Sequence, residues 1–307
     1  MTTPSVVTPG NHDGVHLGHR ALVAAARDLG SERGLRTVAM FFDPHPAAVV
    51  APQRVPGLLT TSARRTDLLL GAGAEVVLAQ PFDRGFASLS PRRFAEDVLV
   101  KRAGARAVVV GPDFRFGLQR TGDVALLTEL GHELGFDVAQ VDPVLHDGER
   151  VSSTRVRSLL ERGDVAGAAP LLGRAHDVDG VVVEGDRRGR TIGFPTANLA
   201  CEPIVLPADG VYAVVVRRLD RPDAPRLGGV ANLGERPTFA AGRAAEVHLL
   251  DFEGDLYGVR LRMAFVTRIR PERRFEHVEA LKDQIGADVA AARRALVAVD
   301  EGWLTCL

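Results

Sequence analysis

The N-terminal residues best suited to chemistry lie in one short segment, GNHDGVHLGH, at residues 10–19. An apolar run precedes it and an amphipathic pattern follows it, so the segment is predicted to open a helix. A helix N-terminus offers free N–H groups and a positive dipole to phosphate. His16 and His19 are neighbours on one helix face and can donate hydrogen bonds to a triphosphate and to the charge that builds at an attacked phosphorus. The other residues of this predicted phosphate-binding loop are Gly10, Asn11, Asp13, Gly14 and Gly18.

Two other interpretations of this segment stay open at this point. His12, His16 and His19 have i, i+4, i+7 spacing, which would suit zinc on one continuous helix, although Gly14 and Gly18 disfavour such a helix. A glycine-rich turn before a helix can also be purely structural.

Three later segments change the balance between these interpretations. FDPHP at 42–46 and GPDFRFG at 111–117 each follow a predicted strand. The carboxyl ends of parallel strands are where an open α/β sheet binds ligands. VSSTRVR at 151–157 opens a helix and supplies hydroxyls, helix N–H groups and arginines to phosphate. The nucleotide-binding residues expected there are Ser152, Ser153, Thr154 and Arg157.

Together, HxGH, the HPH-type loop, GPDFRFG and VSSTRVR resemble the N-terminal module of prokaryotic riboflavin kinase/FAD synthetases, a branch of the nucleotidylyltransferases. The resemblance covers residues 5–172. It implies transfer of AMP from ATP to the phosphate of FMN with release of pyrophosphate, and it implies flavin contacts from Asp113, Phe114 and Phe116. Such a transfer needs no covalent intermediate, so catalysis would consist of alignment and charge stabilisation.

Two residues depart from this family's pattern. His12 stands where the family usually has phenylalanine, and Pro9 stands where it usually has an aliphatic residue. Pro9 removes a backbone donor at the end of a central strand, unless the strand ends at Thr8. An imidazole at position 12 can gain a proton near neutral pH, and burying it unpaired is costly. We therefore hypothesise that FMN adenylylation is weakened here; the alternative is that His12 contacts a different nucleotide or flavin.

A second segment has residue types suited to binding or catalysis. It is GDRRGRTIGFPTANL, at residues 185–199. Its glycines suit a loop that folds over phosphates through backbone N–H groups. Thr196 and Asn198 offer oxygen ligands two residues apart, which suit a hard cation such as Mg²⁺. Taken alone, PTAN is equally compatible with an ordinary turn.

The whole segment resembles the signature of riboflavin kinases, and GGVANLGERPTF, EVHLLDF and DLYG downstream match that family's later motifs. The resemblance runs from about residue 173 to 296. It implies that Glu246 is the base that takes the proton from the ribityl 5′-hydroxyl, and that Thr196 and Asn198 hold Mg²⁺ and ATP phosphates. The further contacts implied are nucleotide contacts at Gly185, Asp186, Arg190 and Gly193, and flavin contacts at Asn232, Arg236 and Thr238.

The elements that must position these residues differ between the two halves. Up to about residue 172, short apolar strands alternate with helices, which predicts a doubly wound, Rossmann-like parallel sheet. The expected strands are 6–8, 37–42, 75–79, 105–111 and 136–141, and the expected helices are 19–33, 64–70, 91–102 and 124–134.

From about residue 175 the pattern favours antiparallel strands and a small β-barrel. The expected strands are 179–184, 211–219, 246–252 and 259–267. An apolar stripe at helical spacing then predicts a closing helix packed on the core; it comprises Phe275, Val278, Leu281, Ile285, Val289 and Leu296. The predicted domains are residues 1–172 and 173–307.

Composition excludes several other classes of protein. The chain is 46% hydrophobic and 25% charged, as in globular proteins, and its net charge of −1 argues against a general nucleic-acid-binding surface. No apolar run approaches the roughly 20 residues of a membrane span, and the N-terminus lacks a secretory pattern, so we expect a cytoplasmic protein. Cys201 and Cys306 form neither a disulfide framework nor a zinc motif.

The sequence therefore predicts an enzyme that phosphorylates riboflavin in its C-terminal half and adenylylates FMN in its N-terminal half. Its partners would be riboflavin, FMN and ATP, with Mg²⁺ as cofactor and no particular oligomeric state indicated. One alternative is a kinase joined to an impaired or altered adenylyltransferase. Another is a non-catalytic flavin-binding regulator, which Thr196, Asn198 and Glu246 argue against because binding alone needs no base.

Overall fold

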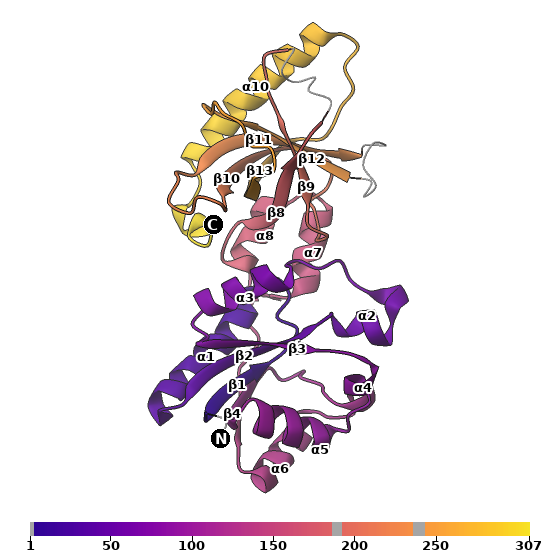
Figure 1. The fold of residues 1–307 in the computed structure, drawn as a ribbon, viewed down its shortest axis with the longest axis vertical. Helices are drawn as coiled ribbons and strands as arrows, with labels where there is room; N and C mark the ends of the chain where they lie inside the picture. The colour runs from indigo at the N-terminus through magenta and orange to yellow at the C-terminus, as the bar shows by residue number, and fades with distance from the viewer. Residues whose placement is uncertain (1–2, 186–191, 236–242) are drawn as a thin grey trace. The chain divides into compact units, whose positions relative to one another are not determined.

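The structure, a computed structural model, describes residues 3–185, 192–235 and 243–307. The chain divides into two compact units, Met1–Ser153 and Thr154–Leu307. Figure 1 shows helices and strands alternating in the first unit and strands gathered into a barrel in the second. Among the described residues, no helix has the length and apolar character needed to span a membrane.

The first unit is built on a five-stranded sheet in the order β3-β2-β1-β4-β5. Every pairing in it is parallel, as the alternating pattern predicts. The direction of the strand order changes between β1 and β4, which is where such sheets bind ligands. The strands are β1 (Ser5–Pro9), β2 (Arg36–Asp43), β3 (Val76–Pro81), β4 (Ala105–Val110) and β5 (Asp137–Gln140), with a small hairpin of β6 (Leu145–His146) and β7 (Glu149–Arg150).

Helices cover both faces of this sheet because β1 and β4 are apolar on both sides. Ala26 of α1 packs with Val6 and Val109 on one face. Leu99 and Leu127 pack with the opposite face. The helices are α1 (Leu17–Arg33), α2 (Pro46–Val50), η1 (Pro52–Arg54), α3 (Ser62–Gly71), α4 (Arg84–Ala87), α5 (Pro91–Arg93), the π-helix η2 (Phe94–Arg102), η3 (Leu118–Arg120) and α6 (Val124–Leu134).

The second unit is a closed barrel in the order β10-β11-β12-β9-β8-β13, with all neighbours antiparallel. The last helix packs on its outer face, where Ala292 joins a cluster with Val211 and Val230. Its elements are α7 (Ser153–Glu161), α8 (Val165–Leu172), β8 (His176–Val183), β9 (Ala197–Cys201), β10 (Gly210–Arg218), β11 (Leu227–Glu235), β12 (Arg243–Leu249), β13 (Arg260–Arg270), α10 (Val278–Val297) and η4 (Glu301–Leu304).

The structure corrects two expectations and adds a division of the chain. Strands β9 and β11 were not among the expected strands, and Val278 of the apolar stripe is 55% exposed rather than in the core. Compact packing divides the chain at Ser153/Thr154, which places α7 and α8 with the barrel. The functional boundary at 172/173 stays a prediction.

Candidate active sites in the two units

The loop between β1 and α1 has an unusual backbone. His12, Gly14 and Val15 have φ of 47°, 85° and 42°, which is the left-handed region that non-glycine residues rarely adopt. A β-branched residue such as Val15 is especially disfavoured there, and such strain persists only where surrounding contacts impose it. The loop is therefore held in place by its neighbours.

Pro9 is compatible with its place in the central strand. The amide of Gly10 donates to the Met40 carbonyl of β2 at 3.0 Å, so the nitrogen of Pro9 faces the opposite side, toward β4. The β1–β4 pairing ends at Val7. The hydrogen bond that proline cannot make thus falls beyond the end of that pairing, although the strand itself continues through Pro9.

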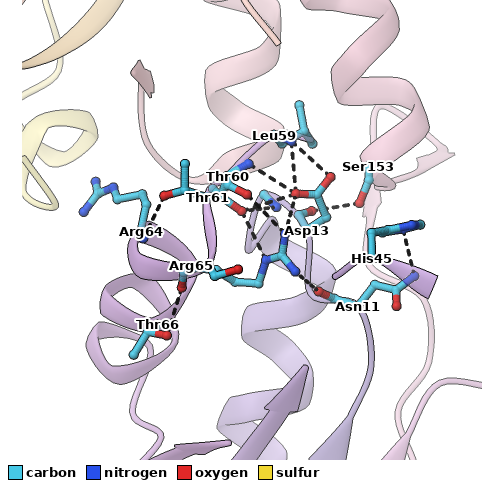
Figure 2. A network of polar contacts seen from close by, with 12 residues as sticks. Asn11, Asp13, His45, Leu59, Thr60, Thr61, Arg64, Arg65, Thr66 and Ser153 are labelled. Carbon is cyan, nitrogen blue, oxygen red and sulfur yellow. Dashed lines mark hydrogen bonds and ion pairs between the residues drawn. The ribbon is translucent and has the colours of Figure 1, made fainter. Parts of the chain in front are cut away.

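The Asp13 carboxylate holds the loop from inside the protein. The side chain is 2% exposed. It accepts hydrogen bonds from the backbone amides of Leu59 and Thr60 at 3.0 and 3.2 Å and pairs with Arg65 at 3.2 Å (Figure 2). The hydroxyl of Ser153 donates to the Asp13 carbonyl at 2.9 Å, which joins the start of the SSTxxR segment to the loop. Asp13 and Ser153 therefore support the predicted phosphate site structurally.

His12 and His16 of the loop and His19 of α1 form one aromatic cluster. The rings of His16 and His19 stack with centroids 3.7 Å apart, and His12 meets His19 edge-on at 5.1 Å. Parallel stacked rings do not converge on a metal ion, and among the described residues no group of three His, Cys, Asp or Glu side chains is arranged to hold one. The geometry thus disfavours the zinc interpretation.

His12 is fully buried, and its Nε2 lies 3.1 Å from the Thr8 carbonyl oxygen. Burial, together with the charge of nearby Arg65, lowers the pKa of His12 to about 4, although the Thr8 bond opposes the shift. The expectation that this imidazole gains a proton near neutral pH is therefore wrong. A side chain with no exposed surface also cannot touch a ligand, which argues against direct contact with a nucleotide.

His19 is held neutral in the same way. Burial lowers the pKa of His19 well below 6.5, and His16, His12 and Arg65 lower it further. A neutral imidazole still carries one N–H and can act as a hydrogen-bond donor to phosphate oxygen.

Tight packing explains why two glycines flank these histidines. A Cβ at Gly18 would lie 3.1 Å from the His16 ring, and one at Gly10 would lie 3.2 Å from the His12 ring. The neighbouring loop after β2 also contributes: Asn11 Nδ2 lies 3.2 Å from Nε2 of His45, which caps α2.

The three predicted flavin residues after β4 have different surroundings from one another. Asp113 forms a two-bond ion pair with Arg150 at 3.0 and 2.9 Å, and this pairing lowers the pKa of Asp113. Phe114 is half-buried and stacks on Phe116 at 5.6 Å. Phe116 is 5% exposed and belongs to the core of the sheet, so the expected direct flavin contact is not visible for this ring.

The remaining predicted nucleotide residues of the first half lie at or beside α7. Ser152 precedes the helix and is half-buried, whereas Thr154 and Arg157 lie within α7 and belong to the second compact unit.

In the barrel, three predicted site residues lie in one row. Glu246 of β12 is directly opposite Asn198 of β9 and also directly opposite Asn232 of β11. Residues directly opposite one another project from the same face of a sheet. Val230, two residues before Asn232, packs with α10, so the row lies on the outer face of the barrel.

Gly185, after β8, and Phe194 and Pro195, before β9, lie against this row or beside it. A Cβ at Gly185 would overlap the Asn198 amide, so only glycine fits there. His248, two residues after Glu246, has its Nδ1 2.8 Å from the Pro195 carbonyl oxygen, and Phe194 meets its ring edge-on. Thr196, beside Pro195, is exposed, and Gly193 has φ of 91°.

A cleft of about 490 Å³ begins at His248 and continues toward α10. Leu249, Leu250, Phe252 and Val289 give it apolar walls, and the paired side chains Asp251 and Arg293 give it a charged edge. Four predicted site residues, Asp186, Arg190, Arg236 and Thr238, lie outside the described residues.

The sequence analysis did not single out Arg65 and His248, which contact predicted site segments in the structure. Arg65 lies in an arginine-rich chain, where no single arginine stands out, and its burial is visible only in the structure. His248 lies in the EVHLLDF motif, two residues from Glu246, and alternation along a strand would have placed both on one face.

Comparisons with known proteins match each half of the chain to a family. Residues 1–155 match the FAD synthetase family, and residues 172–296 match the riboflavin kinase family. The bifunctional riboflavin kinase/FMN adenylyltransferase of Escherichia coli K12 is 44% identical, over 94% of this chain and 91% of its own. The protein of that description from Pseudomonas fluorescens is 42% identical, over 94% and 92%.

A solved structure described as a macrolide-efflux protein from Streptococcus pneumoniae has a TM-score of 0.86 and 32% identity, over 95% of both chains. Its fold matches that of this chain along nearly its whole length. From these matches, the chain belongs to the family of bifunctional riboflavin kinase/FMN adenylyltransferases.

Proposed function

We propose that the barrel transfers the γ-phosphoryl group of ATP to the 5′-hydroxyl of riboflavin, and that the parallel-sheet unit transfers AMP from ATP to FMN. The observation that carries the proposal is the row of Asn198, Glu246 and Asn232 across three strands. It places a carboxylate between two amides on one face, beside a glycine-containing segment.

In the kinase, Glu246 accepts the proton of the ribityl 5′-hydroxyl as its oxygen attacks the γ-phosphorus. The bond from that phosphorus to the β,γ-bridging oxygen breaks, and ADP leaves. Phosphoryl transfer depends mainly on alignment and charge stabilisation, so one carboxylate is sufficient as the base. Asn232, in the same row, would orient the ribityl chain.

Asn198 has the properties of a ligand for a magnesium ion. Asn198 is 6% exposed, and its Oδ1 has no hydrogen-bond partner among the described residues. A buried amide oxygen without a partner is costly, and hard cations take such ligands. Asn198 and Thr196 would hold Mg²⁺, which when bound neutralises charge on the ATP phosphates.

We assign the riboflavin ring to the cleft that begins at His248. Leu250, Phe252 and Val289 line part of it and suit the face of a flat aromatic ring system, and polar side chains line the rest. Because His248 and Glu246 share one face of β12, a flavin in this cleft would extend its ribityl chain along that face toward the carboxylate.

In the first unit, an oxygen of the FMN phosphate attacks the α-phosphorus of ATP. The bond from that phosphorus to the α,β-bridging oxygen breaks, and pyrophosphate leaves. His16 and His19, at the start of α1, donate hydrogen bonds to the phosphate oxygens as their charge increases, and the helix N-terminus adds its dipole. The half-buried Phe114 is the aromatic surface proposed for the flavin.

The test is chromatography of the products after incubation with riboflavin, Mg²⁺ and each of ATP, GTP, CTP and UTP. We expect FMN and then FAD with ATP. FMN without FAD would restrict the proposal to the kinase, and neither product would overturn it in favour of a flavin-binding regulator.

A further inference from the structure

We propose that Arg65 is a positioning residue for FMN adenylylation, because its buried guanidinium fixes the loop that ends at His16 and packs through His12 against His19 of α1. The inference rests on the proposed function of the first unit. Arg65 lies on α3, outside every motif that suggested the activity, and its side chain is 2% exposed. Arginine is almost never this buried unless it is fully paired.

Its guanidinium binds the loop at two points. Nη1 donates to the Asn11 carbonyl oxygen at 3.1 Å, and Nη2 lies 3.2 Å from the Asp13 carboxylate (Figure 2). These two residues flank His12, whose ring meets that of His19. The loop is thus held on both sides of the residue that contacts the histidine cluster.

The same guanidinium binds the segment that the loop rests on. Nη2 also donates to the Thr60 carbonyl oxygen at 3.1 Å, and Nε lies 3.4 Å from the Thr60 hydroxyl. That hydroxyl accepts from the Gly14 amide at 3.1 Å. Underneath, the guanidinium lies over the ring of Phe41 at 4.9 Å. One side chain therefore fixes the loop relative to both α3 and β2.

The loop needs such a clamp because of its backbone. His12 and Val15 occupy left-handed conformations that cost free energy. Without external contacts the loop would relax and His16, the N-cap of α1, would move with it. The stacking of His16 on His19, which lies within α1, would then be lost. A displacement of about 1 Å in a catalytic group can cost on the order of a hundredfold in rate.

A role in stability alone makes a different prediction. Removing one member of a buried ion pair leaves an uncompensated charge, whereas removing both does not. The double variant Asp13→Asn/Arg65→Met should therefore recover most of the unfolding temperature that Arg65→Met loses. The double variant still lacks the hydrogen bond to the Asn11 carbonyl oxygen. If Arg65 positions the loop, the adenylylation rate of the double variant should therefore stay low.

The experiment uses the full chain and measures kcat and KM for ATP from FMN-dependent pyrophosphate release, with riboflavin phosphorylation and thermal unfolding recorded in parallel. We expect Arg65→Met and the double variant to lose about 10–100-fold in adenylylation kcat, with phosphorylation within about twofold of wild type. Arg65→Lys should be intermediate, because an ammonium cannot reproduce the fork of contacts.

Arg64→Met is the matched control. Arg64 is the adjacent buried arginine of α3, and its side chain points away from Asp13 (Figure 2). We expect it to keep adenylylation near wild type. Activity that returns with stability in the double variant, or an equal loss in Arg64→Met, would overturn the proposal. A wild type that never adenylylates FMN would instead overturn the proposed function.

Discussion

Glu246 and Asn198 lie directly opposite one another on the antiparallel strands β12 and β9, although they are 48 positions apart along the chain. The pairing puts the proposed base and the proposed magnesium ligand on one face at neighbouring positions. The Oδ1 atom of Asn198 has no hydrogen-bond partner among the described residues. A cation bound at this face would satisfy that atom. The barrel register thus brings together the two groups that we propose for phosphoryl transfer.

Replacing Glu246 by Gln should lower riboflavin phosphorylation by about 10²–10⁴-fold, because the amide keeps the size of the side chain but cannot take the proton. The measurement is FMN formation with saturating ATP and Mg²⁺. FAD formation from supplied FMN is the internal control and should be unchanged. A near-normal phosphorylation rate would remove Glu246 from the mechanism.

Replacing His16 or His19 by Ala should have the opposite selectivity. Each donor to a developing oxyanion contributes roughly 10²–10³-fold, so FAD formation should fall by that order in each single variant while phosphorylation is spared. The double variant should be little worse than the more damaging single one, because the stacked rings act as one unit. Full-rate FAD synthesis in either variant would make the loop purely structural.

Much of the fold could be predicted because the strands of the first unit are short apolar runs separated by amphipathic helices. Buried parallel strands have this pattern wherever they occur. β11 escaped prediction because Leu227–Glu235 contains three glycines and an asparagine, which have low strand propensity. Barrel closure, which requires β11, supplies the missing hydrogen bonds.

The sequence indicates candidate site residues where a motif contains residue types suited to phosphate or cation binding, and it indicates less where burial decides what a residue contacts. HxGH and PTAN can be recognised in the sequence because their residue types suit phosphate and cation binding. That Asp13 binds backbone amides and Phe116 lies in the core depends on contacts with distant segments. Periodicity over a short window carries no information about such contacts.

The kinase should function without the first unit, and the structure refines where to cut the chain. Val165, Leu171 and Leu172 of α8 are fully buried, and the Leu160 carbonyl of α7 accepts from the Ala208 amide. Residues 154–307 should therefore make FMN at near the full-length rate. Residues 173–307 should retain every proposed catalytic residue but unfold at a lower temperature. A folded 154–307 chain that makes no FMN would contradict catalytic independence.

His12→Phe should raise FMN adenylylation without altering the choice of nucleotide. The Nδ1 of His12 has no hydrogen-bond partner among the described residues, and an apolar ring at this position would remove that unpaired polar atom. The ring is fully buried, so it cannot select among bases. The measurement is pyrophosphate release with ATP, GTP, CTP and UTP. If the wild type adenylylates FMN rapidly with ATP and His12→Phe is slower, the hypothesis that His12 impairs adenylylation is wrong.

The same variant should also change how stability depends on pH. The folded-state pKa of His12, about 4, lies below its ordinary value of 6.5, so between these values the unfolded chain binds more protons than the folded one. The stability gained by keeping this imidazole neutral is present above pH 6.5 and is lost as pH falls toward 4. The full loss amounts to about 3 kcal/mol.

Denaturant unfolding of the first unit at pH 7, 6 and 5 measures this dependence. Wild type should lose about 2 kcal/mol more than His12→Phe between pH 7 and pH 5, because phenylalanine binds no proton. The depressed pKa of His19 acts in the same direction, but it is present in both proteins and leaves their difference unchanged to first order. Parallel stability curves for the two proteins would mean that His12 is hydrated rather than buried and neutral.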